Sequence, residues 1–313
     1  MKKLIVVAFG GNSLLKKDQE GTIDEQEQNI YDTCLHLVEM VKSGHNIVIG
    51  HGNGPQVGNV LLQHDAGKKM YGLPVQPIDF CVAETQGSLG FMFEQQLRNV
   101  FAIHGIDRNI VALITQVVVD KNDPAFQNPS KPVGPFYTKA DSEALAAEKG
   151  WIFREDPRKR GWRRVVASPK PLEVPAWKDV ERLAREGTIV ITAGGGGIPA
   201  YFNENGKIIG IDAVVDKDLA LSVVASRIRA DEFIILTDVP AVCLNFHKPN
   251  EQILSRASVD EMKKHLADGQ FAEGSMAPKV MACIQYLENS GEQAIITRAE
   301  DLNNENAGTK MYR

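Results

Sequence analysis

Three glycine-rich segments are the first features of this sequence that could do chemistry. They are Gly10-Gly11-Asn12-Ser13, His51-Gly52-Asn53-Gly54 and Gly194-Gly195-Gly196-Gly197. Because glycine has no side chain, backbone N–H groups in such segments can approach a phosphate or another small anion closely. A tight turn is the structural alternative for the first segment, and a flexible linker is the alternative for the run at 194–197. That run lies between two predicted strands without surrounding serines, which favours anion binding.

Three lysines stand beside unusual segments and could bring positive charge to a phosphate. They are Lys131, Lys217 and Lys279. Phosphoryl transfer needs cations where negative charge spreads over the transferring group. A lysine in the first turn of a helix is unfavourable for the helix dipole, so the predicted position of Lys279 makes more sense if it faces an anion. Surface solvation is the alternative for each lysine alone. Asp218 could orient two lysines or form an exposed ion pair.

Two other groups of side chains have open interpretations. His51 could transfer a proton, or it could be a structural histidine that is hydrogen-bonded to the backbone. The basic cluster Arg158, Lys159, Arg160, Arg163 and Arg164 could bind an anion, or it could be the solvated tip of a hairpin.

Several common site types are not indicated by the sequence. The chain has no Gly-x-x-x-x-Gly-Lys-Ser/Thr segment, and no Gly-x-Gly-x-x-Gly opens a predicted helix, so a P-loop and a nicotinamide site are not expected. The four cysteines, Cys34, Cys81, Cys243 and Cys283, are far apart and form no metal-type pair. We expect no metal site made of protein side chains, and reduced thiols in a cytoplasmic protein.

Alternating apolar runs and helical patterns must position these candidate residues. Strands are predicted at Leu4–Phe9, Asn46–Ile49, Ile110–Val119, Thr188–Thr192, Glu232–Thr237 and, as the last strand, Gln293–Thr297, with a hairpin arm at Lys207–Ile211. Helices are predicted near 30–41 and at Gln56–His64, Ala83–Ile103, Asp141–Lys149, Lys217–Ile228 and Pro278–Asn289. This order predicts an α/β fold with a mainly parallel, helix-covered sheet, whose ligands bind at the carboxyl ends of the strands.

Residues 120–175 interrupt this rhythm. Residues 120–138 are rich in Pro, Asn and Asp and show no clear period, and a hairpin is predicted from Trp151–Arg154 and Trp162–Ala167. A long irregular insertion in a compact domain is usually a functional lid or loop. We therefore expect an excursion from the main sheet over about 120–175.

Composition limits the class of protein. The chain has 313 residues, 43% of them hydrophobic and 24% charged, which is ordinary for a globular protein. Its net charge of −5 makes it a poor candidate for binding nucleic acid or an anionic membrane. No apolar run approaches the ~20 residues that span a membrane, and Leu4–Phe9 is too short for a signal peptide.

The ordered set of motifs resembles the amino acid kinase superfamily, and within it the carbamate kinases, over essentially the whole chain. The motifs are Ala8–Leu14, His51–Gly58, Asn128–Tyr137, Ala167–Pro171, Gly194–Pro199, Asp212–Ala220 and Gly274–Lys279. Other superfamily members have a lysine just before the first glycines, where this chain has Val6-Val7-Ala8-Phe9. Carbamate kinases resemble this chain in supplying a lysine from a protruding subdomain, at the position of Lys131.

The resemblance implies a three-layer αβα sandwich around a mainly parallel open sheet, formed by one domain over residues 1–313. Its N-lobe would be 1–186, with the protruding subdomain at about 120–175, and its C-lobe 187–313. The N-lobe would hold carbamate or carbamoyl phosphate, and the C-lobe ATP or ADP with Mg²⁺. Such enzymes are usually cytoplasmic homodimers.

The resemblance also implies roles for individual residues. Lys131, Lys217, Lys279 and Asp218 would be the catalytic residues. Carbamate and its phosphate would bind at Gly10, Gly11, Asn12, Gly52, Asn53 and Gly54. The nucleotide would bind at Gly195, Gly196, Lys217, Thr237, Asp238, Ala241, Val242, Met276 and Lys279.

The implied activity is ATP + carbamate = ADP + carbamoyl phosphate, run toward ATP in the fermentative catabolism of arginine or other carbamoyl compounds. Two alternatives stay open. One is another acyl-phosphate kinase of the superfamily, and the other is a nucleotide-binding regulator without catalysis.

Overall fold

The computed structural model describes residues 2–16, 18–156 and 159–313. Within these ranges the main sheet has eight strands in the order β15-β17-β16-β12-β1-β2-β9-β3. Neighbouring strands are parallel except β16 and β17. The strands are β1 Leu4–Ala8, β2 Asn46–Gly50, β3 Ile110–Ala112, β9 Ile189–Ile191, β12 Glu232–Leu236, β15 Arg256–Ser258, β16 Gln293–Thr297 and β17 Thr309–Tyr312.

The central strands are apolar on both faces because helices cover both faces. Along β1, Val6 and Ala8 belong to one buried cluster, whereas Ile5 and Val7 belong to another on the opposite side. This alternation follows from the two-residue period of a strand, and strands buried on both sides read as continuous apolar runs. The run Leu4–Phe9 is therefore explained by its place at the centre of the sheet.

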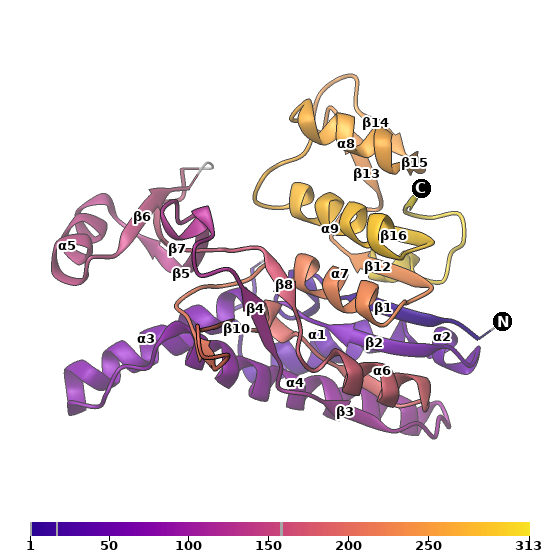
Figure 1. Ribbon diagram of the computed structural model, residues 1–313, viewed down its shortest axis with the longest axis horizontal. Coiled ribbons are helices and arrows are strands. Elements are labelled where there is room, and N and C mark those ends of the chain that lie inside the picture. Colours follow the sequence, from indigo (N-terminus) through magenta and orange to yellow (C-terminus); the bar gives the residue numbers. More distant parts are fainter. Residues whose placement is uncertain (1, 17, 157–158) are drawn as a thin grey trace.

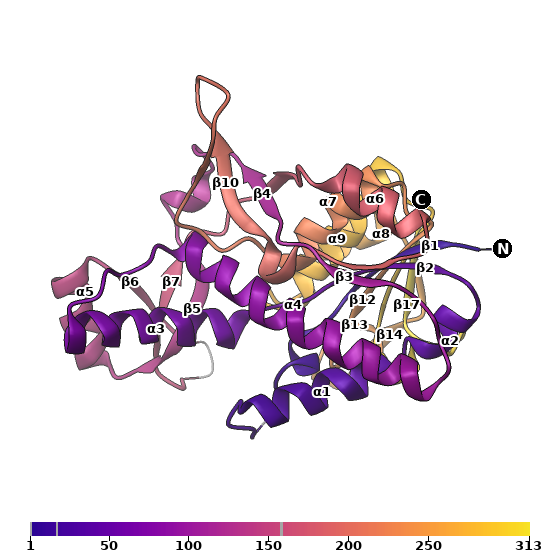
Figure 2. The same cartoon turned by 90° about the horizontal axis from the view of Figure 1, so that it is seen from below.

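Helices form the two outer layers of the fold. On one face lie α6 Trp177–Arg185, α7 Lys217–Arg227 and α9 Met276–Asn289, and on the other lie α1 Ile23–Leu35, α2 Val38–Lys42 and α4 Ile78–Ile103. Figure 2 shows the two helical layers above and below the sheet. The predicted three-layer α/β fold is confirmed.

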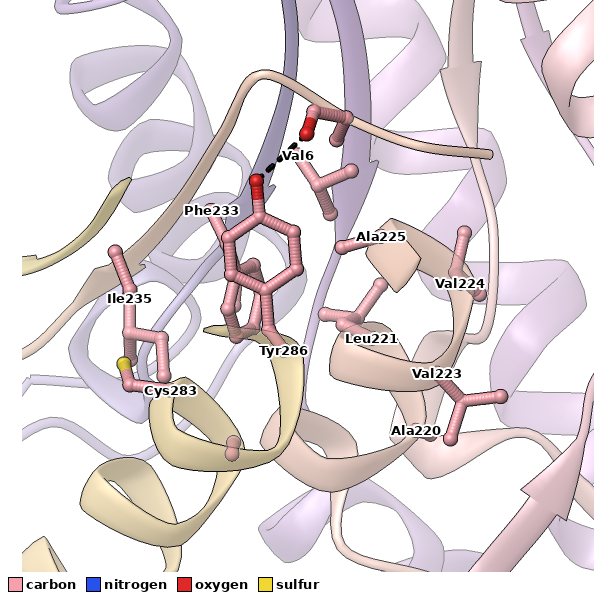
Figure 3. Close-up of a cluster of buried hydrophobic side chains, with 14 of the residues drawn as sticks. Val6, Ala220, Leu221, Val223, Val224, Ala225, Phe233, Ile235, Cys283 and Tyr286 are labelled. Atoms are coloured by element: carbon pink, nitrogen blue, oxygen red, sulfur yellow. Dashed lines mark hydrogen bonds between the residues drawn. The ribbon is translucent and has the colours of Figure 1, made fainter. Parts of the chain in front are cut away.

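One core holds α7 and α9 side by side against the sheet. Figure 3 shows Leu221 and Ala225 of α7 beside Tyr286 of α9, with Phe233 of β12 next to the Tyr286 ring. The Tyr286 ring packs edge-on against Phe233, and its hydroxyl donates to the Ala230 carbonyl oxygen at 2.7 Å. Because a buried hydroxyl needs a partner, this bond fixes the end of α9 to the turn before β12.

A small subdomain projects from the main body. Its three-stranded antiparallel sheet has the order β5-β7-β6, formed by β5 Lys131–Tyr137, β6 Ile152–Glu155 and β7 Trp162–Val166, and α5 Lys139–Lys149 packs beside it. Figure 1 shows this unit on the left, away from the main sheet. Its base packs against α3 Gly54–Tyr71. Gly58 of α3 contacts Gly134 of β5 so closely that a Cβ added to Gly58 would lie 2.6 Å from Gly134 Cα.

The remaining elements form two smaller sheets and a helix above α9. A four-stranded sheet has the order β11-β10-β4-β8, and β13 pairs with β14. Their bounds are β4 Gln116–Val119, β8 Pro171–Glu173, β10 Ile198–Phe202, β11 Ile208–Gly210, β13 Val242–Leu244, β14 Gln252–Leu254 and α8 Val259–Ala267. Four short 3-10 helices in the described ranges are η1 Gly11–Ser13, η2 Pro124–Phe126, η3 Gly194–Gly196 and η4 Ala299–Asp301.

Three sequence-based predictions are corrected by the structure. The prediction of a single strand over Ile110–Val119 is wrong. β3 and β4 belong to different sheets, and the Thr115 backbone between them is hydrogen-bonded to the Gln86 side chain. The strand Gln293–Thr297 is not the last, because β17 follows it and pairs antiparallel. Residues 120–138 are not wholly irregular, because β5 forms there; as an edge strand it tolerates Pro132 and Pro135.

No helix in the described part of the chain is long and apolar enough to cross a membrane. The division into lobes at 186/187 stays a prediction, since the main sheet takes strands from both ranges.

Candidate active site

A cleft of about 760 Å³ opens at the carboxyl ends of the central parallel strands. The segments that follow β1, β2, β9, β12 and β16 all contribute to its lining, with Gly10, Gly52, Gly195, Thr237 and Arg298 as examples. This is the position that an open α/β sheet offers to ligands. The starts of α7 and α9 and the first residues of β5 complete its walls.

The glycine run after β9 fits between other parts of the chain. Gly195, Gly196 and Gly197 have φ of 66°, 93° and 84°, which side chains rarely adopt. A Cβ on Gly195 would lie 2.2 Å from Asn53 Nδ2, and one on Gly196 would lie 2.0 Å from the Val215 oxygen. The run is therefore a tightly packed turn and not a flexible linker, and Gly195 is its member that lines the cleft.

A buried polar network supports this turn from behind. Gln86 of α4 donates to the Gly194 carbonyl oxygen at 2.9 Å and accepts from the Thr115 N–H at 2.8 Å. The Thr115 hydroxyl oxygen accepts from the Ala193 N–H at 2.8 Å. Because each buried polar group has a partner, the network holds the strand ends in one arrangement.

His51 is a structural histidine in this geometry. It is 1% exposed, its ring stacks on Phe93 at 5.1 Å, and its Nδ1 lies 2.8 Å from the Gly52 carbonyl oxygen. Burial lowers the pKa of His51 to about 4, with a further contribution from the charge of Lys217. The ring is therefore neutral at physiological pH, and the backbone-bonded alternative describes it.

Asp218 joins two of the three candidate lysines. Its carboxylate accepts from Lys217 Nζ at 2.5 Å and from Lys279 Nζ at 2.9 Å. The Asp218 side chain is 4% exposed, and those of the lysines are 13% and 14% exposed. Asp218 therefore orients two lysines and does not form an exposed ion pair.

The charges of Lys217, Asp218 and Lys279 shift one another's pKa values. Burial opposes ionisation of Asp218, but the charges of Lys217 and Lys279 outweigh it and hold its carboxyl pKa far below the usual range. Burial lowers the pKa of Lys217 although Asp218 opposes that change. Burial also tends to lower the pKa of Lys279, but the charge of Asp218 and the hydrogen bond to it raise that pKa overall. The cluster thus keeps Asp218 ionised between two ammonium groups.

Lys131 approaches the same cleft from the subdomain. As the first residue of β5 it donates from Nζ to the Asp216 carboxylate at 2.7 Å. Asp216 directly precedes α7 and lies one residue before Lys217. The structure therefore brings Lys131, Lys217, Lys279 and Asp218 together in one cleft, although 148 positions separate the outer two in the sequence.

Most of the predicted binding residues also line this cleft. They are Gly10, Gly11, Gly52, Asn53, Gly54, Gly195, Lys217, Thr237, Asp238 and Lys279. Asn12 lies in η1, and its side chain is outside the described part of the structure.

Four predicted nucleotide-binding residues lie outside the described lining. They are Gly196, Ala241, Val242 and Met276. Ala241 and Val242 are buried, and the Val242 N–H already donates to the Thr309 hydroxyl at 2.8 Å.

Several lining residues were missed by sequence reasoning. Lys16, Arg298 and Glu300 lie outside every motif singled out in the sequence, whereas Ser13, Asp216 and Ser275 lie within such motifs but were given no role. Arg298 directly follows β16, so the strand-end rule that selected the glycine segments would have selected it as well. Asp216 could have been found as an acidic residue at the start of a predicted helix, the usual place of an N-cap.

The basic hairpin cluster is largely occupied by its own neighbours. Lys159 pairs with Glu155, Arg160 with Asp156, and Arg163 donates to the Gly134 carbonyl oxygen at 2.8 Å. Arg164 lies over the Trp151 ring at 4.1 Å. Arg158 lies outside the described residues. The solvated hairpin tip describes Lys159 and Arg160, which are exposed, whereas Arg163 and Arg164 are half-buried in β7.

Within the described ranges, no group of three or more His, Cys, Asp or Glu residues could hold a metal ion. The Asp218 carboxylate is engaged by two lysines, so a metal ion in this cleft would depend mainly on ligands from a bound substrate.

Comparisons with known proteins agree with this geometry. The family model described as the amino acid kinase family matches residues 3–298. A carbamate kinase of Thermococcus kodakarensis is 46% identical over 318 residues, which cover 99% of both chains. A carbamate kinase of Pyrococcus furiosus is 47% identical over 300 residues, covering 96% of this chain and 95% of the relative.

A solved structure gives the same result. The carbamate kinase of Giardia lamblia bound to AMP-PNP superposes with a TM-score of 0.90 at 40% identity, covering 99% of this chain and 98% of that one. The chain belongs to the amino acid kinase family. It is therefore an ATP-dependent phosphotransferase.

The buried His51 predicts a pH dependence of stability. Below pH 6.5 the unfolded chain takes up a proton on this ring, whereas the folded chain does so only near its lowered pKa of about 4. Because the unfolded state binds more protons, the free energy of unfolding should fall as the pH drops. His51 alone should account for about 2 kcal/mol between pH 7.5 and 5.

Urea unfolding at both pH values measures this contribution. His51→Gln should show a pH dependence smaller by about 2 kcal/mol, whereas His104→Gln, at an exposed position, should keep that of the unmodified protein. An unchanged pH dependence in His51→Gln would contradict the assignment of a neutral buried ring.

Proposed function

We propose that this protein transfers a phosphoryl group reversibly between ATP and carbamate, as carbamate kinases do. One observation carries the proposal: Lys131, Lys217 and Lys279 converge, with Asp218, on the glycine-lined cleft at the carboxyl ends of the sheet. The relatives with 46% and 47% identity are named carbamate kinases over nearly their whole lengths. Their name supplies the acceptor, which the lysine geometry by itself leaves open.

The reaction requires positive charge more than acid or base catalysis. In an in-line transfer the carbamate oxygen lies opposite the oxygen that bridges the β- and γ-phosphates. Lys131 and Lys217 would stabilise charge on the equatorial oxygens, and Lys279 would stabilise the leaving β-phosphate. Carbamate is already an anion, so no general base is needed, and a neutral structural His51 is compatible with this chemistry.

The two substrates would occupy different parts of the cleft. Backbone N–H groups of Gly10, Gly11, Gly52 and Gly54, together with Asn12 and Asn53, would hold carbamate or the phosphate of carbamoyl phosphate. Gly195, Thr237 and Asp238, which line the cleft, would contact the nucleotide. Contacts from Gly196, Ala241, Val242 and Met276 stay predictions, because these residues lie outside the lining. The bound AMP-PNP of the Giardia lamblia structure supports a nucleotide site in this fold.

Mg²⁺ would enter with the nucleotide. It prefers oxygen ligands and is usually held by phosphates, waters and one or two carboxylates. Asp238 lines the cleft and could supply such a carboxylate. When bound, the ion would neutralise charge on the phosphates. The direction toward ATP, in fermentative breakdown of arginine or other carbamoyl compounds, is part of the proposal, because released carbamate decays to ammonia and CO₂.

Lys131→Met provides the most specific test of the reaction. It should lower kcat for ATP formation from carbamoyl phosphate and MgADP by roughly two to three orders of magnitude, because one cation is lost from the transition state. Methionine keeps the apolar stem, so the loss reports on the charge. Lys139→Met is a matched control, because Lys139 is exposed on the same subdomain and pairs loosely with Glu143 at 3.9 Å.

The same coupled assay separates the alternatives. Near-normal turnover of Lys131→Met would contradict the role of Lys131. Turnover of acetate, aspartate or acetylglutamate, but not carbamate, by the unmodified protein would favour another acyl-phosphate kinase. Tight ADP binding without ATP formation would favour a regulator.

The proposal also includes a homodimer in the cytoplasm. Four free cysteines support a reducing compartment. Exposed apolar side chains gather on α4 and the adjacent β10–β11 hairpin, namely Phe80, Phe91, Phe202, Ile208 and Ile209. An apolar surface of this kind is typical of a subunit interface.

Light scattering on the purified protein should give twice the mass of one chain. Ile209→Lys should shift the mass toward one chain, because it places a charge within the apolar surface. Lys207→Glu, at an exposed position just outside β11, is the control and should leave the mass unchanged. A single-chain mass for the unmodified protein would contradict the homodimer.

A further inference from the structure

We propose that Asp216 is a positioning residue for the reaction: its carboxylate holds the Lys131 ammonium at the cleft while it caps α7. The inference rests on the proposed function and deepens it. None of the roles argued above for Lys217, Lys279 and Asp218 requires Asp216.

The two oxygens of Asp216 serve different partners. Oδ1 accepts from the Asp218 N–H at 3.0 Å and from the Leu219 N–H at 3.4 Å, which caps α7. Oδ2 accepts from Lys131 Nζ at 2.7 Å. The Asp216 side chain is 14% exposed, so water competes little for these bonds. One carboxylate thus links the subdomain lysine to the helix that carries Lys217 and Asp218.

Asp216 itself is held firmly. The helix that it caps is buried along most of its length and packs against α9. The preceding residue, Val215, lies against the glycine run, where a Cβ on Gly196 would meet its carbonyl oxygen at 2.0 Å. The Val214 N–H donates to the Ala167 carbonyl oxygen at 3.0 Å, just after β7. The carboxylate therefore has a fixed position relative to both the sheet and the base of the subdomain.

Lys131, by contrast, needs an external restraint. Its side chain is 35% exposed and begins at the end of an edge strand. Lysine has a long flexible stem, and fixing its rotamers costs conformational entropy. Its ammonium group has three N–H donors, so one can bind Asp216 while the others face an anion in the cleft. Asp216 can therefore position Lys131 without being displaced by the substrate.

Positively and negatively charged side chains alternate across the cleft. Lys131 and Asp216 form one pair, and Lys217, Asp218 and Lys279 form the next group, so three cations face two carboxylates. One positive charge is left over for an anionic substrate. Asp216 thus keeps Lys131 near its site of action while the cluster remains net positive.

Asp216→Asn separates positioning from helix capping. Asparagine is as good an N-cap as aspartate, so the cap on α7 is kept while the ion pair with Lys131 is lost. We expect kcat for ATP formation from carbamoyl phosphate and MgADP to fall roughly tenfold, because a misplaced catalytic group lowers the rate. The KM for MgADP should change less than about twofold, because Lys217 and Lys279 keep their partner Asp218.

A double-mutant cycle with Lys131→Met tests the coupling. If Asp216 acts through Lys131, Asp216→Asn should have almost no further effect when Lys131 is absent. Asp212→Asn is the matched control, because Asp212 lies in the same segment and its carboxylate accepts from the Ile78 N–H at the start of α4, at 2.9 Å. It should retain normal kcat. If Asp216→Asn does not fold, Asp216→Ser preserves the cap by another side chain and replaces it in the cycle.

Three outcomes would overturn the positioning role. They are an equal loss of kcat with and without Lys131, no loss at all, and a gain of activity, which would mean that Asp216 restrains Lys131 away from its working position. Each assumes that the unmodified protein forms ATP from carbamoyl phosphate. Absence of that activity would instead refute the proposed function, so the two failures are distinguishable.

Discussion

The site depends on one buried carboxylate, Asp218, held between two lysines. Buried charges are stable only when they are paired and hydrogen-bonded, and removal of one partner from such a group is strongly destabilising. Asp218 has little exposure and donates no proton, so both of its neighbours must supply N–H groups. With two ammonium groups for one carboxylate, the group stays electropositive. An anion in the cleft completes its pairing.

This interaction places demands on the whole fold. Lys217 and Asp218 start α7, and Lys279 lies in the first turn of α9, so the two helices must begin side by side at the cleft. Their shared core, with Tyr286 packed against Phe233 of β12, holds them in that relation (Figure 3). The parallel strands place their glycine segments at the same edge, and the Gln86–Thr115 network fixes the turn behind them. Stability and function thus share the same contacts.

Much of this could be predicted from the sequence because the signals are local. The apolar run Leu4–Phe9, the glycine segments after three of the strands and a lysine in the first turn of a helix can each be recognised within a few residues. The pairing of Lys131 with Asp216 joins residues 85 positions apart, so no local pattern indicates it. The break at Thr115 depends on Gln86 from another helix, and β5 forms despite two prolines because its edge position needs fewer backbone donors. Tertiary contacts, and not local sequence patterns, determine each of these three features.

The central claim is that the Asp218 group receives the phosphates of the substrates. The most direct measurement is a crystal structure of the protein with MgADP and a stable mimic of carbamoyl phosphate. We predict that Nζ of Lys217 and Nζ of Lys279 will each lie about 3 Å from a phosphate oxygen while both still bind Asp218. Phosphates bound elsewhere, with both lysines engaged by Asp218 alone, would contradict the account.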